Sequence, residues 1–330
     1  MIEFQSILKD EFQSFLTIRK ACLSESAFMH DKHYLTSFDA FLLEHHLCEK
    51  VISEDILVGW VKTLTGKASS RANEIIVIRI FIQYLHSFGI PAYTPIIPKV
   101  PDDYIPHIFS EDELYRIFDV ADNIIVTKAQ PNPYMRIEFP VILRLLYGCG
   151  LRIGETLALQ MKDVDLDGGI LTILHAKNNR QRFVPMSISL TEILRRYCPV
   201  MGIVGKPDAY LFPGTDPSRP MTVRSARNKF DVILKNTGIA PETMGWHERG
   251  PCLHCFRHLF VFRSFTQAEL SGWAIDDSVP FLSTYLGHDS LNETDKYFKF
   301  SSELYPKALE LFGCYAGSAF PEVDHEKESF

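Results

Sequence analysis

The chain has 330 residues, of which 46% are hydrophobic and 23% are charged, and seven of them are cysteines. These values are ordinary for a globular protein of two domains, and they exclude a largely disordered chain or a small disulfide-stapled one. The formal net charge of −7 argues against a protein that binds nucleic acid, because phosphate contacts normally need a basic surface.

Localisation is suggested by what the sequence lacks. Residues 1–5 have neither the basic start nor the apolar core of a signal peptide, and no run approaches eighteen uncharged apolar residues. An odd number of scattered cysteines fits reduced thiols. We therefore expect a cytoplasmic protein without a membrane-spanning segment.

Residues 1–92 show apolar side chains at helical spacing and predict a bundle of four helices. The third helix is expected to start after Ser53, and the fourth to run from about residue 69 to 88, where Gly89 and Pro91 end it. Arg71 is available on the polar side of this fourth helix. From the residues alone, this region is as well explained by a small bundle without activity of its own as by a domain with a function.

A proline-rich connector follows at residues 93–107. Its four prolines block helix formation and favour an extended chain: Pro95, Pro98, Pro101 and Pro106. We predict a domain boundary here, with a second domain at 108–330.

The second domain is predicted to open with two helices. Ser110 and Glu113 form a capping-box pattern for a helix that continues to about Val126. Another helix is expected from about residue 133 to 147, followed by a glycine-containing turn at 148–150 that leads to Arg152. Glycines beside an arginine let a ligand approach the backbone closely, although Arg152 could equally be a structural residue paired with Glu155.

Two short strands are predicted at 170–174 and 182–185, joined by a hairpin turn that contains Asn178 and Asn179. Lys177 stands at the start of that turn, where it could reach a nucleic-acid groove or remain an ordinary solvated lysine. The predicted fold is therefore mainly α with a small antiparallel β-sheet, in two domains.

A local excess of basic residues offsets the acidic total. Residues 177–235 carry 11 basic groups against 4 acidic ones, whereas residues 302–330 carry 2 against 6. Helices are expected at 189–197 and 222–236, and the second carries Arg224 and Arg227. This row of cations could be a solvated face or could contact phosphates.

The carboxyl-terminal third holds the strongest candidates for catalytic residues. His254 and Arg257 are three residues apart, so they share one face of a helix, and His288 and Tyr297 follow about thirty residues later. An imidazole, a fixed cation, a second imidazole and a phenol together indicate phosphate chemistry. We expect Tyr285 to be packed rather than reactive.

Two features of this region compete with that interpretation. Cys252 and Cys255 with nearby histidines invite a zinc site, although no second Cys-x-x-Cys pair exists in the chain. Residues 267–279 are predicted to form a loop.

The four short motifs around Arg152, Lys177, His254–Arg257 and His288–Tyr297 together resemble those of the tyrosine recombinase, or phage integrase, family. The resemblance implies a helical DNA-clamping domain, a catalytic domain, and a carboxyl-terminal segment that docks on a neighbouring protomer. Six catalytic residues are implied: Arg152, Lys177, His254, Arg257, His288 and Tyr297. Candidate DNA contacts are Arg71, Arg180, Arg224 and Arg227. The implied partners are double-stranded DNA and three further protomers in a synaptic tetramer, with or without a partner recombinase. No metal or cofactor is expected.

The chemistry of these residue types agrees with the resemblance. Two arginines suit the charge of a phosphodiester and cannot lose their protons, and a tyrosine is a competent nucleophile once its proton is taken. By resemblance, Tyr297 attacks the scissile phosphate to form a 3′-phosphotyrosyl link, Lys177 protonates the leaving 5′-oxygen, His254 assists proton transfer and His288 hydrogen-bonds the phosphate.

Several functions remain open at this point. The longer spacing between Arg257 and His288 favours a mobile-element integrase or transposase over an Xer-like resolvase of chromosome or plasmid dimers. A type IB topoisomerase, a catalytically idle DNA-binding accessory protein and a zinc-dependent DNA-binding module are the further alternatives.

Overall fold

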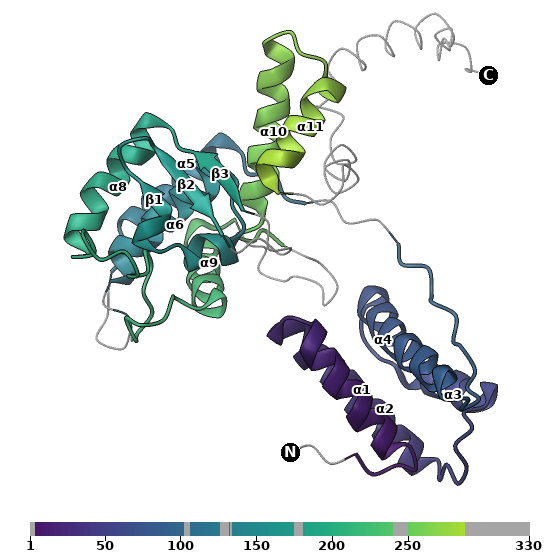
Figure 1. The fold of residues 1–330 in the computed structure, drawn as a ribbon. Helices are drawn as coiled ribbons and strands as arrows, with labels where there is room; N and C mark the ends of the chain where they lie inside the picture. Colours follow the sequence, from purple (N-terminus) through teal and green to yellow (C-terminus); the bar gives the residue numbers. More distant parts are fainter. Residues whose placement is uncertain are drawn as a thin grey trace, which may run out of the picture. The chain divides into compact units, whose positions relative to one another are not determined.

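The computed structural model describes residues 4–101, 106–125, 132, 134–174, 181–239 and 250–287. The chain divides into two compact units, Met1–Asp103 and Tyr104–Phe330, and the division falls inside the proline-rich connector. Each unit has its own hydrophobic core, so each is described by itself (Figure 1).

The first unit consists of helices α1 (Lys9–Cys22), α2 (Glu25–Glu44), α3 (Glu54–Thr63) and α4 (Ala68–Ser87). Ser24 and Ser53 cap α2 and α3 through their side-chain oxygens, so the predicted start of the third helix is confirmed. Aromatic rings fill the core, where Phe12 stacks on Phe81 with centroids 4.2 Å apart. The expected four-helix organisation is confirmed in this part of the chain.

The second unit combines helices with a small sheet. Its elements in chain order are α5 (Glu111–Asp122), α6 (Met135–Cys149), α7 (Ile153–Ala158), the 3₁₀ turn η1 (Met161–Asp163), β1 (Val164–Asp165), β2 (Ile170–Ile173), β3 (Arg182–Pro185), α8 (Ile188–Val200), α9 (Val223–Thr237), α10 (Cys255–Leu270) and α11 (Ile275–Leu286). The strands pair antiparallel in the order β1-β2-β3, with Leu171 opposite Val184. The predicted fold class is confirmed, and β1 adds a strand that the sequence pattern did not reveal.

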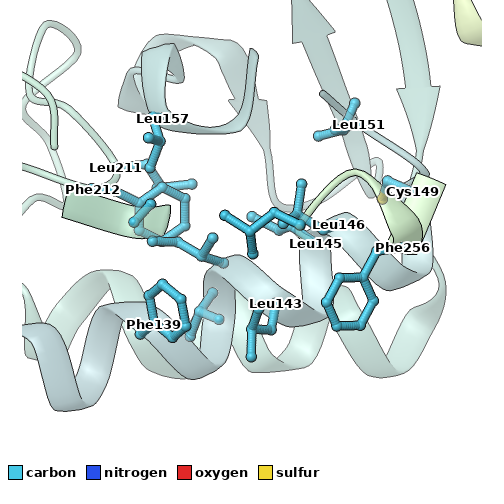
Figure 2. Close-up of a cluster of buried hydrophobic side chains, with 14 of the residues drawn as sticks. Phe139, Leu143, Leu145, Leu146, Cys149, Leu151, Leu157, Leu211, Phe212 and Phe256 are labelled. Carbon is cyan, nitrogen blue, oxygen red and sulfur yellow. The ribbon is translucent and has the colours of Figure 1, made fainter. Parts of the chain in front are cut away.

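Helix α6 runs through the core of this unit. Figure 2 shows its side chains Phe139, Leu143 and Leu146 among residues of other elements, including Leu211, Phe212 and Phe256. All of these side chains are buried. Helix α6 contacts α5, α7, α8 and α10, so it is the common packing partner of these four helices.

Three helices end at residues other than those predicted. Helix α5 has the predicted capping box at Ser110 and Glu113 but ends at Asp122, because the Asn123 side chain donates to the Asp119 carbonyl and caps it. Helix α6 extends to Cys149, and only Gly150 takes the left-handed conformation that ends it. Helix α8 reaches Val200, beyond the predicted residue 197, with Pro199 in its last turn.

The loop predicted at 267–279 is wrong. Residues up to Leu270 belong to α10 and those from Ile275 belong to α11, so the two helices form a hairpin whose connection contains Gly272 in the left-handed conformation. Val279 and Leu282 of α11 are buried against Val261 and Phe265 of α10, which explains why this polar-looking segment is helical. Figure 1 shows the two helices side by side. In the described part of the chain, no helix is long and apolar enough to cross a membrane.

Candidate active site

The site begins where α6 ends. Gly150 has φ +60°, and a β-carbon there would lie 2.5 Å from the Phe260 ring, so both the conformation and the close packing require glycine. Arg152 follows in extended conformation as the residue before α7, with its side chain partly exposed. Only glycine at position 150 therefore allows the tight turn that leads to Arg152.

Glu155 on α7 is the centre of an ion-pair network. Its Oε2 accepts from the Arg152 backbone N–H at 3.0 Å, and its Oε1 accepts from Arg152 Nη1 at 3.0 Å. Arg182, the first residue of β3, donates to both oxygens, at 3.1 Å from Nη1 to Oε1 and 2.7 Å from Nη2 to Oε2. Burial would raise the pKa of Glu155, but the hydrogen bonds and charges of Arg182 and Arg152 outweigh it and hold this pKa below its ordinary value.

Arg257 is buried and joins three elements. Its Nη1 donates to the Gly150 carbonyl at 2.7 Å, and its Nη2 donates to the Leu286 carbonyl at 2.9 Å. The first bond spans 107 residues and the second spans 29. Because the side chain is only 1% exposed, a single guanidinium fixes the end of α6, the start of α10 and the end of α11 relative to one another.

His254 immediately precedes α10, and its ring packs edge-on against that of His258 with centroids 4.7 Å apart. Loss of hydration, followed by the positive charges of Arg257 and Arg152, lowers the pKa of His254 to about 4. Burial, followed by the neighbouring His254 and Arg257, lowers the pKa of His258 to about 3. Both imidazoles are therefore neutral at pH 7, and His254 is able to accept a proton.

Tyr285 on α11 is packed, as expected. Its ring stacks on Phe260 with centroids 5.3 Å apart, and its hydroxyl donates to the Cys149 carbonyl at 3.2 Å. Burial raises its pKa above the ordinary value, which makes it a poor nucleophile.

Cys252, which precedes α10, and Cys255, its first residue, form a thiol pair. Their Sγ atoms are 3.8 Å apart, and Cys255 is buried whereas Cys252 is exposed. A hydrogen bond from Cys255, with help from the Arg227 charge, lowers the pKa of the Cys252 thiol to about 6. Among the residues that the structure describes, no group of three or more His, Cys, Asp or Glu side chains could hold a metal ion.

The structure thus brings together three of the six candidate catalytic residues: Arg152, His254 and Arg257. The other three, Lys177, His288 and Tyr297, lie outside the described residues, as does the candidate DNA contact Arg180. The remaining candidate DNA contacts, Arg71 on α4 and Arg224 and Arg227 on α9, are all exposed.

Sequence reasoning missed one residue of this site, Arg182. In the sequence pattern it is only one of the basic residues of 177–235. The alternation of β3 carried the missing signal, because Arg182 and the buried Val184 lie two positions apart and share the inner face, whereas Phe183 between them is 71% exposed. A charged side chain directed inward from a strand needs a partner, and Glu155 supplies it.

Comparison with known proteins places these features in a family. The profile of the phage integrase family matches residues 108–303. The chain is 26% identical over 271 residues to the integrase/recombinase y4rB of Sinorhizobium fredii, covering 78% of this chain and 83% of that one. It is 25% identical over 279 residues to the tyrosine recombinase XerC of Staphylococcus carnosus, covering 82% and 84%.

Solved structures agree at the level of the fold. The XerH site-specific recombinase, in a post-cleavage complex with a palindromic difH substrate, superposes with a TM-score of 0.68 at 18% identity, covering 89% of this chain and 82% of that one. The Tn1549 transposon integrase in complex with transposon right end DNA gives a TM-score of 0.65 at 14% identity, covering 92% and 98%. Since the family profile spans more than half of the residues, and since the resemblance first seen in the motifs is confirmed, this chain belongs to the phage integrase family, the family of the tyrosine recombinases.

Proposed function

We propose that this recombinase cuts and rejoins double-stranded DNA at specific sites through a 3′-phosphotyrosyl intermediate formed by Tyr297. The observation that carries the proposal is the convergence of Arg152, His254 and Arg257, since Arg257 bonds the backbone beside Arg152 and both guanidinium charges act on His254. Two permanent cations suit an anionic phosphodiester, and the neutral imidazole beside them can accept a proton.

Each residue then has one role. Arg152 and Arg257 bind the non-bridging oxygens of the scissile phosphate and stabilise the charge that builds up as Tyr297 attacks. His254 accepts or relays the phenolic proton, Lys177 protonates the leaving 5′-oxygen, and His288 hydrogen-bonds the phosphate. The phosphodiester energy is kept in the tyrosyl link, so that a 5′-hydroxyl can reverse the step, and no metal ion takes part.

The assembly belongs to the same proposal. Residues 1–92 and the catalytic domain at 108–330 both bind the DNA, with Arg71, Arg180, Arg224 and Arg227 on phosphates. Four protomers meet in the synapse, and the segment after Tyr297 docks on a neighbour. Support comes from the solved relatives, which include recombinases in complex with DNA.

For the biological role we propose integration, excision or transposition of a mobile element. The similarity to y4rB and to the fold of a transposon integrase favours it. The similarity to XerC and to the XerD of Rickettsia conorii favours the second candidate, dimer resolution. The spacing between Arg257 and His288 does not decide between them, because that segment is the α10–α11 hairpin rather than an added loop.

Covalent trapping tests the reaction. The full chain is incubated, in the presence of EDTA, with nicked duplexes that contain the sequences flanking its gene, and protein–DNA adducts are counted after denaturation with SDS. We expect an adduct with the wild type and with Tyr305→Phe, and none with Tyr297→Phe. An adduct that survives in Tyr297→Phe would move the nucleophile elsewhere, and an adduct that requires a metal ion would contradict the mechanism.

A further inference from the structure

The carboxylate of Glu155 is shared unequally between two arginines. Arg182 binds it bidentately, with one terminal guanidinium nitrogen on each oxygen, at 3.1 Å and 2.7 Å. The guanidinium of Arg152 makes a single contact, from Nη1 to Oε1 at 3.0 Å. Bidentate pairing is the strong geometry of an arginine with a carboxylate, so Arg182 holds the position that Arg152 would otherwise take.

Burial makes this competition decisive. The side chains of Glu155 and Arg182 are only 4% and 9% exposed, whereas that of Arg152 is 27% exposed. A buried carboxylate needs its charge compensated, and with a single arginine in reach it would bind that arginine bidentately. With two arginines, the group carries a net charge of +1, and its more accessible cation is Arg152.

Arg182 also touches the segment that leads to His288. A β-carbon at Gly287 would lie 3.0 Å from Arg182 Nη1 and 3.2 Å from its Cδ, so the guanidinium packs directly on this glycine. Gly287 has φ +66° and ends α11. Arg182 therefore connects the Arg152–Glu155 segment, the hairpin strand β3 and the end of α11.

We propose that Arg182 is a positioning residue for DNA cleavage: by binding Glu155 bidentately, it prevents this carboxylate from capturing Arg152 and keeps the Arg152 guanidinium directed to the scissile phosphate. This inference rests on the proposed function. It assigns Arg182 no contact with DNA, because both terminal nitrogens of its guanidinium bind the Glu155 carboxylate and its side chain is only 9% exposed.

The test is a double-mutant cycle on the full chain. In Arg182→Gln, Glu155 turns to Arg152, and we expect the rate of adduct formation on the nicked duplex to fall about 10- to 100-fold, with a smaller change in the Kd for the same duplex. Adding Glu155→Gln removes the competing carboxylate, so the double variant should recover at least about tenfold of the loss. Arg182→Lys, which keeps the charge but lacks the planar fork, should fall between the wild type and Arg182→Gln.

Arg196→Gln is the matched control, since it removes an arginine that is ion-paired with Glu192 but whose side chain is 80% exposed on α8. A merely structural role predicts the opposite order, with the double variant no faster than Arg182→Gln, and that order would overturn the proposal. Wild-type rates in Arg182→Gln would overturn it as well. Circular dichroism of each variant shows whether it is folded.

A readout without DNA separates this inference from the proposed function. The Nε–H signal of the Arg152 guanidinium, followed by ¹⁵N NMR in the DNA-free chain, should shift in Arg182→Gln and return toward its wild-type position in the double variant. An unchanged signal in Arg182→Gln would refute the positioning role even in a chain that cleaves DNA. Failure of the wild type to form any adduct would refute the proposed function, while the NMR shifts would still decide the role of Arg182.

Discussion

At the scale of single residues, the site depends on two positions that carry no side chain. Gly150 supplies the carbonyl that Arg257 binds, and Gly287 gives Arg182 room to reach Glu155. Both have positive φ, and a β-carbon would overlap the Phe260 ring at Gly150 and press on the Arg182 side chain at Gly287. The arginines are therefore positioned as much by the absence of neighbouring side chains as by the presence of Glu155.

Gly150→Ala should lose stability and cleavage together. The left-handed conformation costs a non-glycine residue about 1–2 kcal/mol, and overlap with the Phe260 ring adds about 1–3 kcal/mol. We expect urea denaturation of the full chain to show a loss of about 3 kcal/mol in unfolding free energy, and adduct formation to drop further because the carbonyl that holds Arg257 is displaced.

Gly202→Ala is the control for the conformational cost alone, because Gly202 has φ +63° and nothing lies within 4 Å of the position that an added methyl group would take. It should lose about 1 kcal/mol and cleave normally. Equal losses in the two variants would show that the contact with Phe260 is unimportant.

At the scale of elements, the helices α10 and α11 show what the sequence could and could not predict. The apolar spacing and the placement of His254 and Arg257 on one face were readable, because helix geometry alone brings residues three apart together. The helical hairpin was not, since its stability comes from tertiary contacts such as Val279 on Phe265 rather than from local pattern. The Glu155–Arg182 pair was missed for the same reason, because it joins residues 27 apart.

The first turn of α10 also predicts a pH dependence of stability. An unfolded histidine has a pKa near 6.5, whereas burial and the charges of His254 and Arg257 lower that of His258 to about 3. Between these values the unfolded chain binds more protons than the folded one. The contribution to stability is therefore complete above pH 6.5 and declines as the pH falls, by at most about 1.4 kcal/mol per pH unit for each histidine.

His258→Gln should accordingly make the urea midpoint less sensitive to pH between 7 and 5, a range above the titration of most carboxylates. His30→Gln, at an exposed position on α2, controls for the loss of a histidine as such. If His258→Gln kept the full acid sensitivity of the wild type, His258 would not be held neutral in the folded chain.

At the scale of the whole molecule, the local charge of some segments is opposite in sign to the net charge of the chain. The net charge is −7, but residues 302–330 carry 6 acidic groups against 2 basic ones, whereas residues 177–235 carry 4 against 11. Composition alone therefore argued against nucleic acid, and only the position of the charges kept DNA binding open. Exposed Arg227 lies close enough to Cys252 to lower its pKa, which places part of the basic region beside the start of α10.

The salt dependence of DNA binding tests whether both units contact phosphate. Each phosphate contact adds about 0.9 to the slope of log K against log salt, because bound counterions are released. Arg71→Gln in the first unit and Arg227→Gln in the second should each reduce this slope by about 1 and weaken binding similarly on all sequences, as measured by fluorescence anisotropy from about 50 to 200 mM salt. Arg196→Gln, which removes an equal charge from the exposed face of α8, should leave the slope unchanged. If Arg227→Gln lowered the slope and Arg71→Gln did not, phosphate binding at these positions would be confined to the catalytic unit. If all three substitutions lowered it equally, the effect would come from the net charge and not from specific phosphate contacts.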